Sequence, residues 1–292
     1  MAGMECRQSG FTMIELIIVI VISGILSLAI MQFISVPVEA YVDQSRRARL
    51  VGIAETAVDR LGQDISAALP NSLRVGCGGS CLEYLRSVAG GRYRNAPPGD
   101  VLSFNPADSD TAFDVLGPLD LPAGLATSGS AGACANGLAA CLVVYNTGFA
   151  GTDAWQGDNI ASITAISSTS VSFNNSDFSS GTPAFPAESP GQRFFVVDSP
   201  VSYLCDTGSG LLRRYEGYNI RQSQADVDTH AELLALSNPA ESAVLADDLS
   251  GCSFSYTPGT PTRKAVLTVS LVISDAGESV RLLQQIGVMN GT

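Results

Sequence analysis

Basic residues are scarce in this sequence. Lysine and arginine together number 16 against 28 aspartates and glutamates, which gives a formal net charge of −12, and Lys264 is the only lysine. The arginines are scattered, apart from Arg46, Arg47 and Arg49. Because binding to nucleic acid needs a basic stripe that neutralises phosphates, this composition argues against a nucleic-acid partner.

Histidine and the common catalytic motifs are also lacking. His230 is the only histidine, and the sequence contains no G-x-S-x-G, no H-x3-H and no G-x4-G-K. Adjacent carboxylates such as Asp247 and Asp248 are typical of the surface of so acidic a protein. We therefore predict a protein that is not an enzyme, with no catalytic residues, no cofactor and no metal, and with His230 exposed to solvent.

Charged residues of either sign make up only 15% of the chain, whereas small residues such as glycine and serine are abundant. This is not the composition of a disordered chain. It suits an extracytoplasmic, β-rich domain with many loops. At 292 residues, the sequence has room for one large domain or two small ones after an N-terminal segment.

The N-terminal segment is long and apolar. Residues 11–34 are 24 residues whose only charge is Glu15, and as a helix they would span about 36 Å, enough to cross a bilayer. A cleaved signal peptide has a basic start and a shorter apolar core, whereas here a polar leader, MAGMECRQSG, ends in Gly10. A charge beside such a segment is a functional candidate, with the alternative that Glu15 simply reaches water at the membrane interface.

The apolar segment continues into an amphipathic pattern. Over residues 51–69, apolar side chains recur every three or four positions and charged side chains fall between them. This is the period of a helix that lays one face on a protein core. We therefore predict one helix from about Thr12 to Ala68, with a kink at Pro37, which removes a helix hydrogen bond, and an end at Pro70.

Beyond Pro70 the pattern changes to short β-like runs separated by glycine, proline, serine and asparagine. The C-terminal end gives the clearest signal, because residues 264–273 alternate in polarity and return after a turn as residues 280–288. This pattern predicts a hairpin whose apolar face packs on the amphipathic half of the helix, and hence an α+β fold. The other expected strands are 101–104, 141–146, 162–173, 193–197, 201–205 and 211–215; residues 122–141 are expected to be a loop and 222–236 a short surface helix.

Six of the seven cysteines follow the apolar segment, and Cys6 lies in the leader. In an exported domain an even number of cysteines predicts disulfides, although 15 connectivities are formally open. A zinc site is the alternative, but C-x3-C and C-x6-C match no standard finger. The spacing suggests the pairs Cys77–Cys81, Cys134–Cys141 and Cys205–Cys252.

Two further groups of side chains suggest ligand binding. Asp108, Asp110 and Asp114 are spaced somewhat like calcium ligands, but the glycine and terminal glutamate of a helical calcium loop are missing, so a solvated acidic loop is favoured. Trp155 and Tyr145 could form an aromatic platform for a ligand, but core packing is favoured for both.

The polar leader ending in Gly10, then Phe11, Glu15 and an unbroken apolar helix together resemble a type IV prepilin. The resemblance implies that a prepilin peptidase, which is also the N-methyltransferase, cleaves after Gly10 and methylates the new N-terminus, Phe11. It implies that Glu15 takes part in filament assembly by neutralising the terminal amine of a neighbouring subunit. The implied partners are other major and minor pilins and the assembly platform of the bacterial inner membrane, with the C-terminal domain periplasmic and later on the pilus at the cell surface.

The length and the terminal hairpin resemble the large minor pilins. The segments 193–218 and 252–290 are similar to a branch that contains W-type minor pilins, J-type pseudopilins of type II secretion and a component of the mannose-sensitive haemagglutinin (MSHA) pilus, while Glu15 argues against the K-type pseudopilins. The resemblance implies a minor pilin, with a tip adhesin or a secretion pseudopilin as alternatives. Arg46, Arg47 and Arg49 oppose the implied orientation, since basic residues usually remain cytoplasmic. The expected segments are a leader (1–10), a transmembrane half-helix (11–36), an amphipathic half-helix (37–69), a loop-rich β region (70–190) and a C-terminal β region (191–292).

Overall fold

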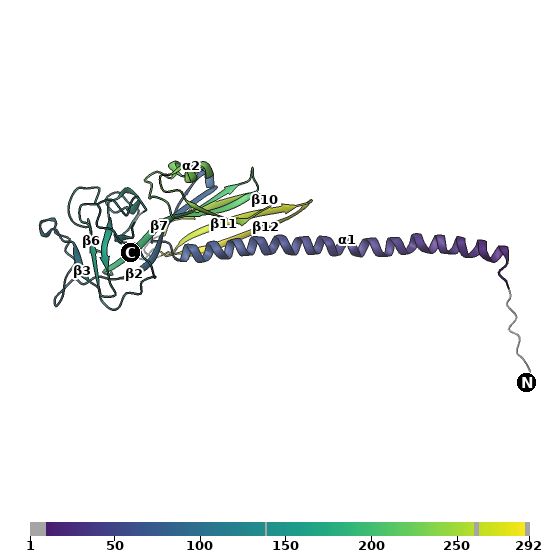
Figure 1. Cartoon of the computed structure of the whole chain (residues 1–292), viewed down its shortest axis with the longest axis horizontal. Coiled ribbons are helices and arrows are strands. Elements are labelled where there is room, and N and C mark those ends of the chain that lie inside the picture. The colour runs from purple at the N-terminus through teal and green to yellow at the C-terminus, as the bar shows by residue number, and fades with distance from the viewer. Residues whose placement is uncertain (1–9, 138, 260–262, 290–292) are drawn as a thin grey trace, which may run out of the picture. The chain divides into compact units, whose positions relative to one another are not determined.

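The structure is a computed structural model that describes residues 10–137, 139–259 and 263–289. The chain divides into two compact units, Met1–Arg49 and Leu50–Thr292, which are described separately below. Helix α1 (Met13–Ser66) begins in the first unit and ends in the second, close to the predicted bounds (Figure 1). The helix is continuous through Pro37, and the kink expected there stays a prediction.

In the second unit, the last turns of α1 cover one side of the main core. The apolar side chains predicted to face inward are buried, whereas Glu55 and Asp59 on the same helix are exposed. These side chains form a core with the C-terminal strands. Each Å² of apolar surface that this core removes from water stabilises the fold by roughly 25 cal/mol. The helix contributes Leu50, Ala54, Ala57, Val58, Leu61 and Ile65 to this cluster.

The terminal hairpin is confirmed. Strands β10 (Leu249–Thr257), β11 (Ala265–Asp275) and β12 (Glu278–Val288) form an antiparallel sheet in that order. From Ala265 to Ile273, every second residue of β11 has a solvent exposure of 0%, as the alternation predicts for a strand with one buried face. These residues are Ala265, Leu267, Val269, Leu271 and Ile273, and they share a cluster with the buried face of α1.

A second, larger antiparallel sheet forms the rest of the domain. Its order is β1-β2-β7-β4-β5-β6-β3, with β8 pairing β7 and β9 pairing β8. Strand β7, from the expected C-terminal region, pairs with β2 and β4 from the expected loop-rich region, so one sheet contains strands of both. The strands are β1 (Arg74–Gly76), β2 (Cys81–Arg92), β3 (Ala112–Asp114), β4 (Cys141–Val144), β5 (Ile160–Ile166), β6 (Ser170–Phe173), β7 (Arg193–Asp206), β8 (Leu211–Glu216) and β9 (Glu241–Ala246).

Strand β7 replaces the two strands that were expected at 193–197 and 201–205. It is a single strand that runs through Pro200. On one side, β4 pairs with residues 194–197 and β8 pairs with residues 201–206, so the pairing partner changes around Pro200. Proline has no backbone N–H to donate to a neighbouring strand. Pro200 lies between the residues that pair with β4 and those that pair with β8, so its missing N–H interrupts neither pairing.

Three other expectations need correction. Residues 101–104 are a loop instead of a strand, because their backbone donors are used locally: Leu102 N–H donates to the Arg94 carbonyl at 3.0 Å and Ser103 N–H to Asp110 at 2.7 Å. The run 162–173 is divided into β5 and β6 by a turn in which Ser167 bonds Ser170. Within 222–236, the α-helix is only α2 (His230–Ala235), preceded by a 3-10 turn (Gln224–Asp226).

Candidate functional site

The junction between Gly10 and Phe11 lies outside regular structure. Gly10, Phe11 and Thr12 precede the first residue of α1, and the Phe11 side chain is 83% exposed. A Cβ built on Gly10 would meet no other atom within 4 Å. The expected cleavage point is therefore exposed and outside regular structure, whereas the preceding residues, including Cys6, lie outside the described residues.

Thr12 and Glu15 form the N-terminal cap of α1. The Glu15 carboxylate accepts the backbone N–H of Thr12 at 3.2 Å, and the Thr12 hydroxyl oxygen accepts the backbone N–H of Glu15 at 3.3 Å. This reciprocal pair is a capping box, which satisfies two helix donors that otherwise have no partner. The local signal for this cap is T-x-x-E at residues 12–15, whereas the roles expected for Glu15 were contact with a neighbouring subunit or with water at the membrane interface.

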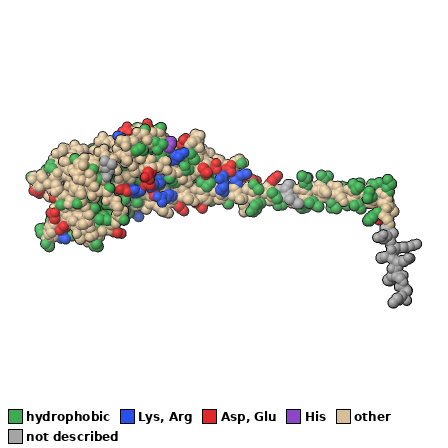
Figure 2. Space-filling view, in the orientation of Figure 1, with side chains coloured by type: hydrophobic (Ala, Val, Ile, Leu, Met, Phe, Trp, Pro, Cys, Tyr) green, Lys and Arg blue, Asp and Glu red, His purple; other side chains and the backbone are tan. Residues whose placement is uncertain are grey.

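The helix that follows is long and apolar enough to cross a membrane. Residues Met13–Met31 have a mean hydropathy of 2.8, and none of the span is buried within the chain. In Figure 2, hydrophobic side chains gather on this part of α1, and charged side chains become frequent further along the helix. A fully exposed apolar helix of this length requires lipid or other helices around it.

The six cysteines after the helix are paired as their spacing suggests. The structure contains disulfides between Cys77 and Cys81, Cys134 and Cys141, and Cys205 and Cys252, with Cα–Cα separations of 5.4, 5.1 and 5.9 Å. The first two close short loops. The third connects β7 of the large sheet to β10 of the small sheet and so constrains the two sheets against each other.

A partly buried charge network attaches the end of α1 to the large sheet. Asp64 of α1 pairs with Arg214 of β8 and accepts the Tyr203 hydroxyl at 2.6 Å. Arg214, which is 5% exposed, also pairs with Glu216 at 2.7 Å, and Glu216 contacts Arg86. Burial alone would raise the pKa of Glu216, but its hydrogen bond and charge attraction to Arg214, together with Arg86, lower it.

A second network surrounds Arg74. Its guanidinium pairs with the fully buried Glu83 at 2.8 Å, donates to the carbonyls of Arg221 and Gln222, and lies 3.6 Å above the ring centre of Trp155. Burial raises the pKa of Glu83, opposed by Arg74 and the Tyr218 hydroxyl. Trp155 is itself buried and donates its ring N–H to the Ser72 carbonyl, which agrees with core packing.

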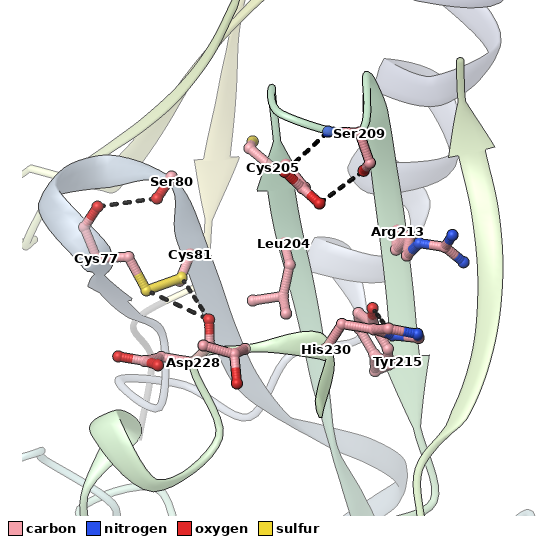
Figure 3. Close-up of a pocket in the computed structure, with 12 residues that line it drawn as sticks. Cys77, Ser80, Cys81, Leu204, Cys205, Ser209, Arg213, Tyr215, Asp228 and His230 are labelled. Atoms are coloured by element: carbon pink, nitrogen blue, oxygen red, sulfur yellow. Dashed lines mark hydrogen bonds between the residues drawn. A yellow bond between two sulfur atoms is a disulfide. The ribbon is translucent and has the colours of Figure 1, made fainter. Parts of the chain in front are cut away.

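A cavity of about 360 Å³ opens beside β2, β7 and β8 (Figure 3). The Cys77–Cys81 disulfide and Cys205 line it, and the carbonyl oxygen of Asp228 lies 3.5 Å from Sγ of Cys81. The Tyr215 hydroxyl and Nδ1 of His230 are 2.7 Å apart, and the Ser209 hydroxyl donates to Asp206 at 2.6 Å. Among the residues that the structure describes, the two serines of this cavity, Ser80 and Ser209, bond Cys77 and Asp206, and His230 bonds Tyr215.

His230 is exposed, as predicted, although its ring bonds Tyr215. The three aspartates accept hydrogen bonds from residues of the preceding loop: Asp108 from the Ser103 hydroxyl at 2.5 Å, Asp110 from Ser103 N–H, and Asp114, the last residue of β3, from Asp100 N–H at 2.9 Å. In the described ranges, no group of three or more histidine, cysteine or acidic side chains could hold a metal ion. Tyr145 is partly buried, with its ring packed against the apolar cluster under the large sheet.

Comparison with known proteins identifies one feature of the chain. Residues 6–31 match the family model described as the prokaryotic N-terminal methylation motif, which supports a prepilin-type protein. The match contains Gly10, Phe11, the capping box and most of the apolar span. No curated protein and no solved structure matched the chain.

Proposed function

We propose that the chain is the precursor of a minor pilin that acts in the assembly, initiation or tip of a type IV pilus of the MSHA kind. The observation that carries the proposal is the N-terminal arrangement: an open Gly10–Phe11 junction, the Thr12–Glu15 cap and an exposed apolar span, all within the methylation motif. Motifs of this type are found in structural subunits that a peptidase processes and an assembly machine polymerises.

In this proposal, the prepilin peptidase cleaves after Gly10 and methylates Phe11. The partners are that enzyme, other major and minor pilins, and the assembly platform of the bacterial inner membrane. The span 13–31 holds the subunit in that membrane with the β domain in the periplasm, until the helix is transferred into the filament. The finer assignment rests on the segments 193–218 and 252–290, which resemble protein O of the MSHA system.

Glu15 has the charge that assembly needs. Cleavage creates a positive amine at Phe11, and a carboxylate about 4 Å away attracts it by several kcal/mol at an effective dielectric near 20, although desolvation offsets much of this. We therefore assign the pair to subunit register more than to filament stability.

The test is intact-mass and N-terminal analysis of the protein from cells with and without the prepilin peptidase. We expect a mature chain that begins at N-methylated Phe11 only when the peptidase is present. A mature chain that begins elsewhere, or an unprocessed chain in both strains, would overturn the proposal.

The alternatives are a tip-exposed adhesin and a minor pseudopilin of type II secretion. Deletion of the gene separates them from an assembly role. We expect fewer pili; normal pilus numbers with lost attachment would favour the adhesin, and normal pili with lost secretion would favour the pseudopilin.

A further inference from the structure

Strand β12 is an open edge of the small sheet. The sheet order is β10-β11-β12, and over residues 279–288 the described backbone bonds of β12 run only to β11. In an antiparallel pair, alternate residues of the outer strand point their N–H and C=O groups away from the partner. About half of this 11-residue strand therefore presents unpaired backbone donors and acceptors.

The outer strands of the large sheet, in contrast, are poor templates for pairing with another chain. β1 and β3 have only 3 residues each. β9 has 6 residues, begins with Glu241, and shows a register shift in its pairing with β8. Short length, charge and irregularity are the devices by which natural proteins block such edges.

β12 is neither short nor irregular, although it begins with Glu278 as β9 begins with Glu241. It pairs one-to-one with β11 from Val288 to Glu278 without a register shift. Residues 279–289, which we call the β12 edge, contain no lysine and no proline, and their only charge is Arg281, whose Nε donates to Ser270 of β11 at 3.3 Å. Leu283 is 60% exposed, and Gln284 and Gln285 beside it are exposed too. A long, regular, nearly uncharged edge of this kind aggregates unless something covers it.

We propose that an extended segment of a different pilin-type subunit covers the β12 edge by adding a strand to the sheet. Backbone hydrogen bonds supply the affinity in this mode, and alternate side chains supply the specificity. The segment that fits is about seven residues long, nearly uncharged, and carries an acidic side chain where it meets Arg281. This inference rests on the proposed function, because it assumes neighbouring subunits of one filament.

A second copy of this chain is a poorer occupant. Two identical edges pair about a two-fold axis, which brings together two domains of like charge. Each copy has a formal net charge of −12, so the two domains repel at low ionic strength. The partner is therefore a chain of lower negative charge.

Photo-crosslinking in cells with the complete assembly machinery tests the proposal. Leu283→p-benzoylphenylalanine places the probe on the β12 edge, and Val244→p-benzoylphenylalanine, on the blocked strand β9, is a matched control because Val244 is 52% exposed. We expect an adduct at position 283 with another protein that carries the N-terminal methylation motif, formed several-fold more than at position 244. Equal yields at both positions, an adduct between two copies of this chain, or an adduct with a protein that lacks the motif would overturn the proposal.

Proline substitution tests whether the backbone makes the contact. Neighbouring residues of a strand direct their N–H groups to opposite sides, so one of Gln284→Pro and Gln285→Pro removes a bond to β11 and the other removes only an outward donor. We expect the outward variant to keep the unfolding midpoint of the full chain and to lose the adduct at position 283. If that variant keeps the adduct at full yield, strand addition is wrong.

If both proline variants lower the unfolding midpoint, the crosslink at position 283 still decides the proposal.

Failure of the proposed β12 contact can be distinguished from failure of the proposed function. A mature N-terminus at Phe11 without a pilin-type adduct rejects only the β12 contact. An unprocessed chain rejects the proposed function.

Discussion

Glu15 accepts the backbone N–H of Thr12 at 3.2 Å, while the Thr12 hydroxyl accepts the backbone N–H of Glu15 at 3.3 Å. The carboxylate that we assign to a neighbouring subunit is thus already engaged with its own helix. An acidic group at this position also interacts favourably with the partial positive charge at a helix N-terminus. Cleavage after Gly10 would place the new amine of Phe11 next to this cap. In the assembled filament, the Glu15 carboxylate would therefore interact both with the start of its own helix and with the amine of a neighbouring subunit.

Glu15→Gln separates these two roles. Glutamine fits the same position of a capping box, so the helix start is preserved, but the negative charge is removed. We expect the variant to be cleaved after Gly10 as in the wild type and to be strongly depleted from sheared pili. Intact mass measures the cleavage, and immunoblotting of pili against whole cells measures the incorporation.

Thr12→Ala is the matched control, because it removes the cap hydroxyl and leaves the charge. Loss of such a cap costs about 1 kcal/mol of helix stability. We expect Thr12→Ala to be incorporated into pili far better than Glu15→Gln. Equal depletion of the two variants would show that the cap, and not the charge, is what assembly requires.

Local periodicity explains which parts of the fold were predictable. The three-to-four-residue repeat of α1 and the alternation of β11 are properties of neighbouring residues, and both predictions are confirmed. The continuity of β7 through Pro200 depends on a change of partner from β4 to β8, which no local pattern contains. The sequence around residues 101–104 has strand character, but Asp110 and the Arg94 carbonyl take its backbone donors.

Asp64 shows the same limit at the level of a single side chain. The amphipathic pattern of the helix places Asp64, like Asp59, among the polar residues between the apolar positions, and so predicts that both are exposed. In the structure its side chain is only 12% exposed and lies beside Arg214, which is 150 residues away in the sequence. A partner at that separation cannot be inferred from one sequence, whereas the T-x-x-E signal at residues 12–15 is local and could have been used.

Asp64→Ala should destabilise the β domain. Removing one member of a buried ion pair leaves the other charge without full compensation, which costs about 3 kcal/mol; Arg214 keeps Glu216, so the loss is at the low end of the usual range. Thermal or urea unfolding of the full chain in detergent measures the change. Asp59→Ala, on the same helix but exposed, should leave the midpoint unchanged, and equal effects of the two variants would contradict the network.

Glu216→Gln tests the acid sensitivity of the same network. Folding lowers the pKa of Glu216 below its ordinary value of 4.5, because the attraction of Arg214 and Arg86 exceeds the effect of burial. A carboxylate of this kind stabilises the folded state above its ordinary pKa, and the stabilisation is lost as pH falls through the folded pKa. We expect the difference in unfolding free energy between wild type and Glu216→Gln to be constant above pH 4.5 and to shrink below it.

Urea unfolding at a series of pH values measures that difference. The other carboxylates of the network are Asp64 and Asp198, which pairs with Arg86 at 2.5 Å, and both are common to the two proteins. Their contributions largely cancel in the subtraction. A difference that grows on acidification would mean that Glu216 is held in its protonated form in the folded protein.

The disulfide between Cys205 and Cys252 should contribute more to stability than that between Cys77 and Cys81. The chain-entropy model depends on loop length, and the sequence separations are 47 and 4 residues. The expected losses on removal are about 4 and about 2 kcal/mol. Thermal unfolding of the double variants Cys205→Ala/Cys252→Ala and Cys77→Ala/Cys81→Ala compares the two losses directly.

The two double variants should also differ in hydrogen exchange. Because the longer bridge connects β7 to β10, we expect its loss to increase hydrogen exchange in β10 and β11, whereas loss of the short bridge should affect only its own loop and the start of β2. Similar exchange in both double variants would mean that the hydrophobic core alone fixes the small sheet against the large one.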